Sequence, residues 1–158
     1  EARLVLIGSD SFDIQTQSLS TWELLKKEFE EEDLEQVSYL GKMSYDNVQE
    51  YIRKANVCVF PSFAETFGMV TIEAMAMQKP VVSNDFGWSQ ELIVSGQNGF
   101  LVHPKKHTDF AKTIVTLLED EHLCEKIGAA ARQRVATVFD IQQIVQQNVD
   151  FYESIISK

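Results

Sequence analysis

Short apolar runs alternate along the chain with longer segments in which apolar residues recur at helical spacing. The short runs predict strands at residues 4–7, 37–40, 57–60, 80–82 and 99–102. The helical pattern between them predicts helices at residues 20–29, 44–52, 67–78 and 87–95. Continuous apolar strands separated by helices are typical of a parallel sheet that is covered on both faces. The pattern therefore predicts the α/β class, with a parallel sheet of about five strands and helices on both faces.

The C-terminal third is predicted to be helical throughout. Apolar positions at helical spacing mark three amphipathic helices, at residues 110–118, 123–135 and 141–156. No repeat or low-complexity segment interrupts the pattern.

The composition excludes several classes of protein. The chain has 158 residues, of which 44% are hydrophobic and 24% charged, so a disordered tail, a collagen and a coiled-coil rod are excluded. No apolar run approaches the ~20 residues that span a bilayer, and no cleavable leader opens the sequence. We therefore expect a soluble, non-secreted protein.

The charge and the cysteines narrow the partners further. A net charge of -10, from 24 acidic and 14 basic residues, argues against nucleic acid or an anionic membrane as a partner. Cys58 and Cys124 match neither a metal-ligand spacing nor a disulfide framework, which favours a reduced cytosolic setting.

Candidate chemistry gathers where the predicted strands end. Gly8, Gly41 and residues 61–68 and 84–87 each follow a predicted strand. Ligands of an open parallel sheet bind outside the carboxyl ends of its strands, where helix N-termini also point. Single glycines at such ends are weak signals, because any tight turn favours one.

The segment at residues 61–73 is more informative. Its predicted helix is apolar nearly all round, so a carboxylate inside it, Glu73, needs a cation, backbone donors or ligand hydroxyls as partners. Glu65 precedes the same helix, whose free N–H groups attract an anion such as phosphate, and Gly68 allows close approach. Eight residues of helix rise ~12 Å, so the two carboxylates could address opposite ends of an elongated ligand such as a nucleoside diphosphate sugar.

Spacing alone favours a plainer alternative, in which Glu65 caps the helix and Glu73 forms an ordinary ion pair. A family resemblance reverses this preference. Residues 61–76, with shorter motifs at residues 80–82, 87–91 and 96–102, resemble the C-terminal, nucleotide-sugar-binding domain of retaining GT-B glycosyltransferases.

The resemblance is to glycosyltransferase family 4, the glycosyl transferases group 1, and it extends over nearly the whole chain. Its core is the E-x7-E motif, two glutamates separated by seven residues, at Glu65 and Glu73. It implies a Rossmann-like sheet, the C-terminal half of a GT-B fold.

The resemblance also implies roles for individual residues. In the family, the first glutamate contacts the donor sugar, a catalytic role that falls on Glu65, and the second holds the ribose hydroxyls. Backbone amides after the first glutamate cradle the diphosphate, and the loop after the second strand packs against the base. The implied donor-binding residues are Gly8, Gly41, Lys42, Met43, Thr66, Phe67, Gly68, Met69, Val70 and Glu73.

The resemblance implies transfer of a sugar from a UDP- or GDP-linked donor to a sugar or lipid-linked acceptor, with retention and without metal or cofactor. The family's common setting is polysaccharide, lipopolysaccharide or glycolipid synthesis, in the cytoplasm or peripherally at the inner membrane. A non-catalytic nucleotide-sugar-binding module, or a GT-B epimerase or phosphorylase, is the alternative.

Two positions depart from the family pattern. Gln78 and Trp88 stand where the family usually has glycine. Gln78 is expected to change only the end of its helix. The ring of Trp88 either narrows the diphosphate site or stacks on the ligand, or else it covers the edge of the sheet.

A larger departure concerns the start of the domain. The family's domain begins with a further strand and a loop that carries an arginine and a lysine, for which this sequence has no match. We therefore expect a domain that lacks its first strand, cut from a longer enzyme with a separate acceptor domain, and inactive alone. The expected parts are an incomplete donor-binding domain at residues 1–139 and a helix at residues 140–158 that docks on the acceptor domain or packs on its own sheet.

Overall fold

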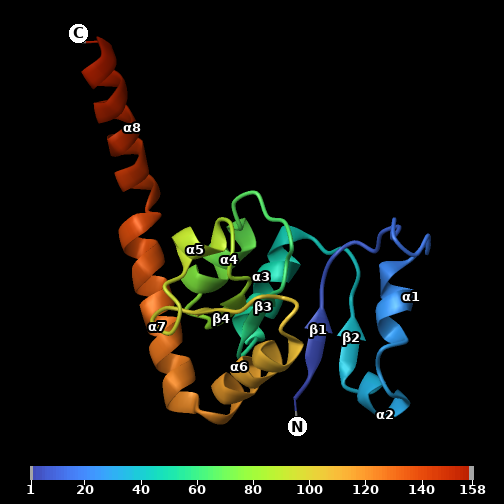
Figure 1. The fold of residues 1–158 in the computed structure, drawn as a ribbon. Coiled ribbons are helices and arrows are strands. Elements are labelled where there is room, and N and C mark those ends of the chain that lie inside the picture. Colours follow the sequence, from blue (N-terminus) through green and yellow to red (C-terminus); the bar gives the residue numbers. More distant parts are fainter. Residues whose placement is uncertain (1, 157–158) are drawn as a thin grey trace. The chain divides into compact units, whose positions relative to one another are not determined.

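The computed structural model describes residues 2–156 and divides the chain into two compact units, Glu1–Glu50 and Tyr51–Lys158 (Figure 1). All five strands pair in parallel, in a two-stranded sheet with the order β1-β2 and a three-stranded sheet with the order β3-β4-β5. The predicted α/β class and the five strands are confirmed. The strands form two separate hydrogen-bonded ladders, however, with one sheet in each unit.

The first unit is built on two parallel strands, β1 (Leu4–Leu6) and β2 (Val37–Tyr39), joined through α1 (Thr21–Lys26) and α2 (Glu31–Leu34). The side chain of Ser20 caps α1 by accepting the N–H of Glu23 at 3.0 Å. The helix ends at Lys26 rather than near residue 29.

The second unit holds the three-stranded sheet. It contains β3 (Cys58–Phe60), β4 (Val81–Ser83) and β5 (Phe100–Leu101), with α4 (Met69–Ala76) and α5 (Ser89–Leu92) between the strands. Helix α3 (Tyr45–Lys54) spans the boundary of the units. All of β4 is buried, as expected for a central strand that has a parallel partner on each side.

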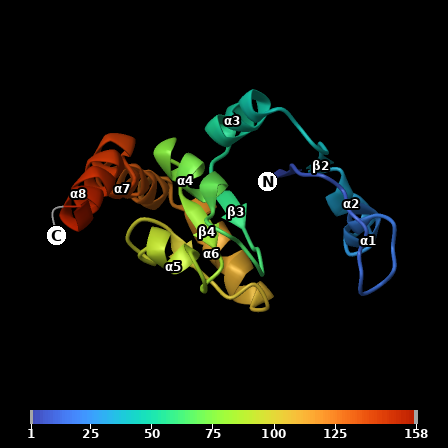
Figure 2. The same ribbon diagram turned by 90° about the horizontal axis from the view of Figure 1, so that it is seen from above.

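Helices cover both faces of the three-stranded sheet. Helix α4 and helix α6 (His107–Glu119) both pack on β4, and Figure 2 shows them on opposite sides of that strand. The core cluster joins Val82 to Phe110 and Leu117 of α6 and to Ile127 of α7 (Glu121–Val138). The predicted covering of both faces is therefore confirmed for this sheet.

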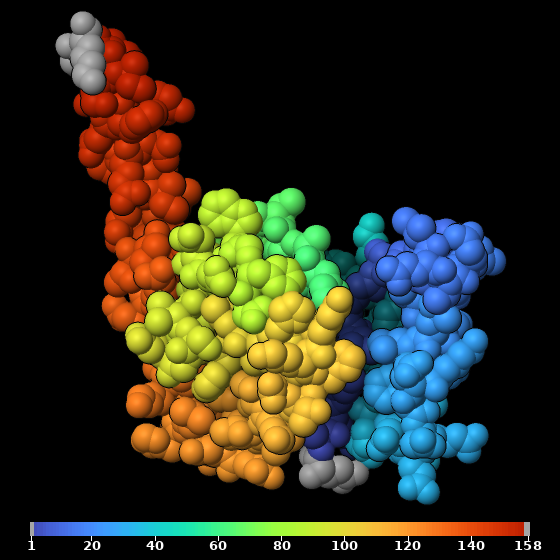
Figure 3. All heavy atoms as spheres, in the orientation of Figure 1, coloured from blue at the N-terminus to red at the C-terminus, as the bar shows by residue number. Residues whose placement is uncertain are grey.

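Helix α8 (Ile141–Ile156) has no buried residue, and its side chains stand uncovered in the space-filling view (Figure 3). Its apolar positions are exposed: Ile141, Val145, Val149, Tyr152 and Ile156. The predicted helix is confirmed, and most of its apolar positions are left largely exposed by the described residues. In residues 2–156, no helix is both long and apolar enough to cross a membrane.

Candidate functional site

The loop after β3 is held in place by the end of the neighbouring strand. Asn84, which is buried just after β4, donates from Nδ2 to the carbonyl oxygen of Ser62 at 2.8 Å. The hydroxyl of Ser83 donates to the carbonyl oxygen of Phe60 at 3.3 Å. The sequence analysis did not assign Asn84 a role, although its place at a strand end was a usable signal. These bonds fix the loop that leads into α4.

The first turn of α4 is left open. Gly68 forms the N-cap in the left-handed conformation, at φ 76°, and no side chain caps the helix. Between residues 2 and 156, the structure shows no hydrogen bond from the backbone N–H groups of residues 67–70. Free N–H groups at a helix N-terminus form a site that favours an anion.

Gly68 is required here for two reasons. Its left-handed backbone is one that residues with a Cβ adopt only at a cost. A Cβ at this position would also lie 3.1 Å from Cδ1 of Leu92 and 3.7 Å from Cγ of Glu65. The backbone is therefore kept bare at the point where helix α5 and Glu65 approach it.

Glu65 lies at the edge of this open turn. Its side chain is exposed, and Oε1 accepts the N–H of Thr66 at 3.0 Å. Glu73 is half-buried on α4 itself and has interactions of its own in the structure. The plainer alternative, in which Glu65 caps the helix, does not hold, because α4 begins at Met69 and its cap has no side-chain hydrogen bond.

The start of α4 also corrects the spacing argument. A rise of ~12 Å assumed helix all the way between the two glutamates. Only the part from Met69 to Glu73 is helical, which accounts for about 6 Å, and the loop sets the rest. The two carboxylates are therefore placed by a loop and a helix together.

Trp88 lies beside the same turn. Its indole meets the ring of Phe67 edge to face, with the centroids 5.5 Å apart, and remains 47% exposed. The structure thus places the indole of Trp88 against Phe67, in the loop that leads into α4.

The glycines predicted at the ends of β1 and β2 come together in the first unit. The N–H of Gly8 donates to the carbonyl oxygen of Gly41 at 3.0 Å, and the hydroxyl of Tyr39 donates to that of Gly8 at 2.9 Å. Lys42, which is exposed, and Met43, which is half-buried, follow directly. One group of predicted site residues therefore lies in the first unit, and the group around α4 lies in the second.

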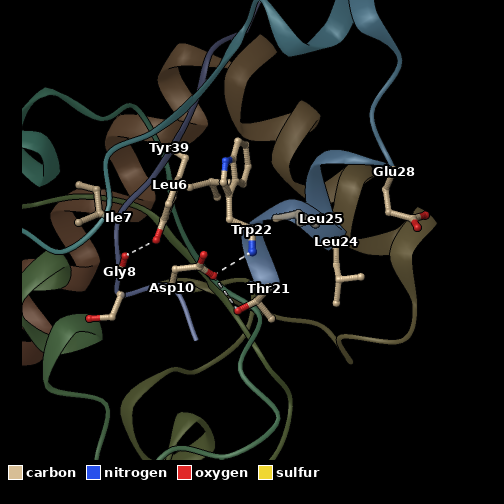
Figure 4. Close-up of a pocket in the computed structure, with 11 residues that line it drawn as sticks. Leu6, Ile7, Gly8, Asp10, Thr21, Trp22, Leu24, Leu25, Glu28 and Tyr39 are labelled. Carbon is tan, nitrogen blue, oxygen red and sulfur yellow. Dashed lines mark hydrogen bonds between the residues drawn. The ribbon is translucent and has the colours of Figure 1, made fainter. Parts of the chain in front are cut away.

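A mostly apolar cavity of about 530 Å³ adjoins Gly8 in the first unit (Figure 4). Its wall includes Trp22, which stacks on Tyr39 with the centroids 4.9 Å apart. At its mouth, the carboxylate of Asp10 accepts the hydroxyl of Ser20 and the N–H of Trp22, and these hydrogen bonds hold the pKa of Asp10 below its ordinary value. The sequence analysis missed this cavity, because it depends on a contact between α1 and β2.

The cysteines and possible metal ligands add no further chemistry. Burial raises the pKa of the Cys58 thiol to about 11, so this thiol is neutral at pH 7. Within the described part of the chain, no three His, Cys, Asp or Glu side chains are grouped to hold a metal ion.

The chain has an α/β fold in which the uncapped first turn of α4 follows the carboxyl end of a parallel strand, where ligands of such sheets bind. The chain belongs to the glycosyl transferases group 1, whose pattern matches residues 1–134. Its fold matches the C-terminal domain of GT-B glycosyltransferases.

Three similar proteins illustrate the family. The chain is 31% identical to N-acetyl-alpha-D-glucosaminyl L-malate synthase of Bacillus anthracis, over 99% of this chain and 38% of that protein. It is 33% identical to the capsular polysaccharide biosynthesis glycosyltransferase CapM of Staphylococcus aureus, over 68% of this chain and 28% of that protein. HepE of Anabaena, solved in complex with UDP, superposes with a TM-score of 0.84 and 28% identity, over 97% of this chain and 41% of that chain. HepE has also been solved with UDP-glucose. The chain thus spans well under half of the length of these relatives.

Proposed function

We propose that this chain is the donor-binding part of a retaining glycosyltransferase of family 4 that transfers a sugar from a nucleoside diphosphate sugar to an acceptor. The observation that carries the proposal is the open first turn of α4, with its bare Gly68 and unbonded N–H groups directly after Glu65. Membership of the glycosyl transferases group 1 supports it.

In this proposal, the N–H groups of residues 67–70 receive the diphosphate of the donor. A helix N-terminus stabilises negative charge, which grows on the leaving nucleoside diphosphate in the transition state. Glu65, at the edge of the turn, contacts the donor sugar as the catalytic residue, and Thr66 adjoins it. Glu73 holds the ribose hydroxyls. The exposed position of Glu65 and the half-buried position of Glu73 on one loop and helix support this division of roles.

The loop after β2, with Gly41, Lys42 and Met43, is proposed to pack against the base, and Gly8 is proposed as a further donor-binding residue. Gly8 and Gly41 meet at the carboxyl ends of β1 and β2, and Lys42 and Met43 follow them. Uracil is the first base to test, in the form of UDP, because HepE was solved with UDP and with UDP-glucose. GDP is the second.

The acceptor and the setting follow the relatives. CapM is a glycosyltransferase of capsular polysaccharide biosynthesis, so we propose a sugar or lipid-linked acceptor in polysaccharide, lipopolysaccharide or glycolipid synthesis, in the cytoplasm or at the inner face of the membrane. The exposed apolar positions of α8 are proposed to dock on an acceptor domain of a longer enzyme. Transfer is proposed to need no metal, so EDTA should leave turnover unchanged.

Replacement of Glu73 tests the proposal. In the complete enzyme, Glu73→Ala should lower kcat/KM for the donor about a hundredfold, because two charge-assisted hydrogen bonds to the ribose are lost. Glu119→Ala, which changes an exposed glutamate at the end of α6, is the matched control and should leave kcat/KM within about twofold. Unchanged donor binding and turnover in Glu73→Ala would contradict the ribose contact.

A further inference from the structure

Two aromatic rings are exposed beside the open turn of α4. Phe67 is 39% exposed and Trp88 is 47% exposed, although the two rings pack against each other edge to face. Edge-to-face pairs hold their members in a defined geometry. The pair therefore presents aromatic surface in a fixed geometry beside the uncapped turn, where a ligand bound at that turn would cover it.

The backbone fixes where this pair lies. The backbone N–H of Phe67 is one of the unbonded groups before and in the first turn of α4, so its side chain is attached at the proposed diphosphate site. Trp88 occupies the N-cap of α5, and Leu92 of the same helix would lie 3.1 Å from a Cβ on Gly68. Helix α5 therefore lies against the first turn of α4 and carries the indole to that turn.

The indole of Trp88 is only partly covered by the described residues. Roughly half of a large apolar side chain faces water, and covering that surface would stabilise a complex by about 25 cal/mol per Å². A hexose ring presents C–H groups on one face and hydroxyls at its rim, so it can cover an aromatic ring while its hydroxyls keep polar partners.

We propose that Trp88, held in place by Phe67, packs against the sugar ring of the bound donor. The proposal rests on the proposed function, since it takes the diphosphate to lie at the open turn. Trp88 then distinguishes a nucleotide sugar from the free nucleotide, because the indole contacts the sugar and not the nucleoside. It is a residue of donor specificity that acts beside Glu65.

Affinities measured on the complete enzyme test this contact. UDP, GDP, UDP-glucose and GDP-mannose would be titrated against the wild type and against Trp88→Ala by calorimetry. Trp88→Ala should lower the affinity for whichever nucleotide sugar binds by about tenfold, while the affinity for the matching free nucleotide should change by no more than about twofold.

Three further variants separate the contact from a general effect on the loop. Trp88→Phe keeps an aromatic ring and should recover most of the affinity for the nucleotide sugar. Phe67→Leu removes the ring that supports the indole and should lower the affinity for the nucleotide sugar about threefold. Phe63→Leu alters a ring that is 61% exposed in the same loop, and it should have no effect beyond about twofold.

Fluorine NMR reports on Trp88 directly. In enzyme labelled with 5-fluorotryptophan, the resonance of Trp88 is the one that Trp88→Phe removes. The Trp88 resonance should shift further when the nucleotide sugar binds than when the free nucleotide binds.

The outcomes separate the two proposals. If the nucleotide sugar binds but shifts the Trp88 resonance no further than the free nucleotide does, and Trp88→Ala binds it as tightly as the wild type, the sugar contact is wrong while the proposed function stands. The pair would then be a docking surface for another protein domain. An equal loss in Phe63→Leu would also overturn the contact. If none of the four ligands binds the wild type, the proposed function fails and the sugar contact fails with it.

Discussion

At the C-terminal end of α4, the protein supplies partners for the last turn, whereas at the N-terminal end it supplies none for the first turn in residues 2–156. Arg132 of α7 donates from Nη1 to the carbonyl oxygen of Ala76 at 2.7 Å, and the N–H of Gln78 donates to Met75 at 2.9 Å. Both ends of a helix leave orphan groups, and a buried end without partners is costly. The C-terminal end is thus held by protein groups, and the N-terminal end is the one to which the proposed function assigns the diphosphate.

The close packing of the structural end is the part most sensitive to substitution. A Cβ at Gly128 would collide with the backbone carbonyl of Gln78, so α7 can approach α4 only because residue 128 is glycine. Gly128→Leu should lower the free energy of unfolding by about 3 kcal/mol, the upper range for overpacking. Thermal unfolding of the complete protein measures this. Ala129→Leu, at the next and exposed position of α7, is the control, and equal losses in both variants would contradict the account.

The open end can be tested with a pair of glycines. Gly68 and Gly96 have φ of 76° and 79°, but only Gly68 has a side chain, Leu92, close to the position of a Cβ. Gly96→Ala should cost about 1 kcal/mol of stability from backbone strain alone, and Gly68→Ala about 2 kcal/mol. Chemical denaturation of the two variants gives the difference. If Gly96→Ala lowered the free energy of unfolding as much as Gly68→Ala, the contact with Leu92 would not contribute to the loss.

The cap from Arg132 should matter less, because its guanidinium is exposed. Arg132→Met removes the donor to Ala76 and should cost about 1 kcal/mol, while nucleotide affinity stays the same. Unfolding midpoints and a nucleotide titration on the same sample check both parts. A loss of nucleotide affinity as large as that of Glu73→Ala would erase the distinction between the two ends.

The smallest effect is expected at Gln78, and it has the opposite sign. Gln78 lies just after α4 with φ at 62°, a left-handed conformation that glycine adopts without cost. Gln78→Gly should therefore raise the free energy of unfolding by about 0.5–1 kcal/mol. A lower unfolding midpoint in this variant would show that the glutamine side chain stabilises the turn.

Much of the fold could be predicted from the sequence, because periodicity reports burial. The apolar run at residues 80–82 predicted β4, and the structure buries all of that strand. The helix predicted from residue 67 begins at Met69, because Gly68 adopts a left-handed conformation that periodicity does not register. The helix predicted to reach residue 29 ends at Lys26, and its apolar spacing gave no sign of this earlier end.

The site could be predicted only in part. The two glutamates and Gly68 were found from the motif, and the structure places them on one loop and helix. The contact of Trp88 with Phe67 joins residues of different loops, so spacing along the chain could not choose it over the edge of the sheet. A lone glycine inside a helical pattern, Gly128, was a signal for close packing that the sequence analysis did not use.

The central claim is that the open turn of α4 receives the diphosphate of the donor. Ligand-detected NMR with UDP, GDP and their sugars, applied to the complete protein and to Gly68→Ala and Gly96→Ala, tests it most directly. The account predicts that a nucleoside diphosphate binds the wild type and Gly96→Ala, and that binding to Gly68→Ala is weaker by at least about tenfold. Equal binding to all three proteins would contradict it.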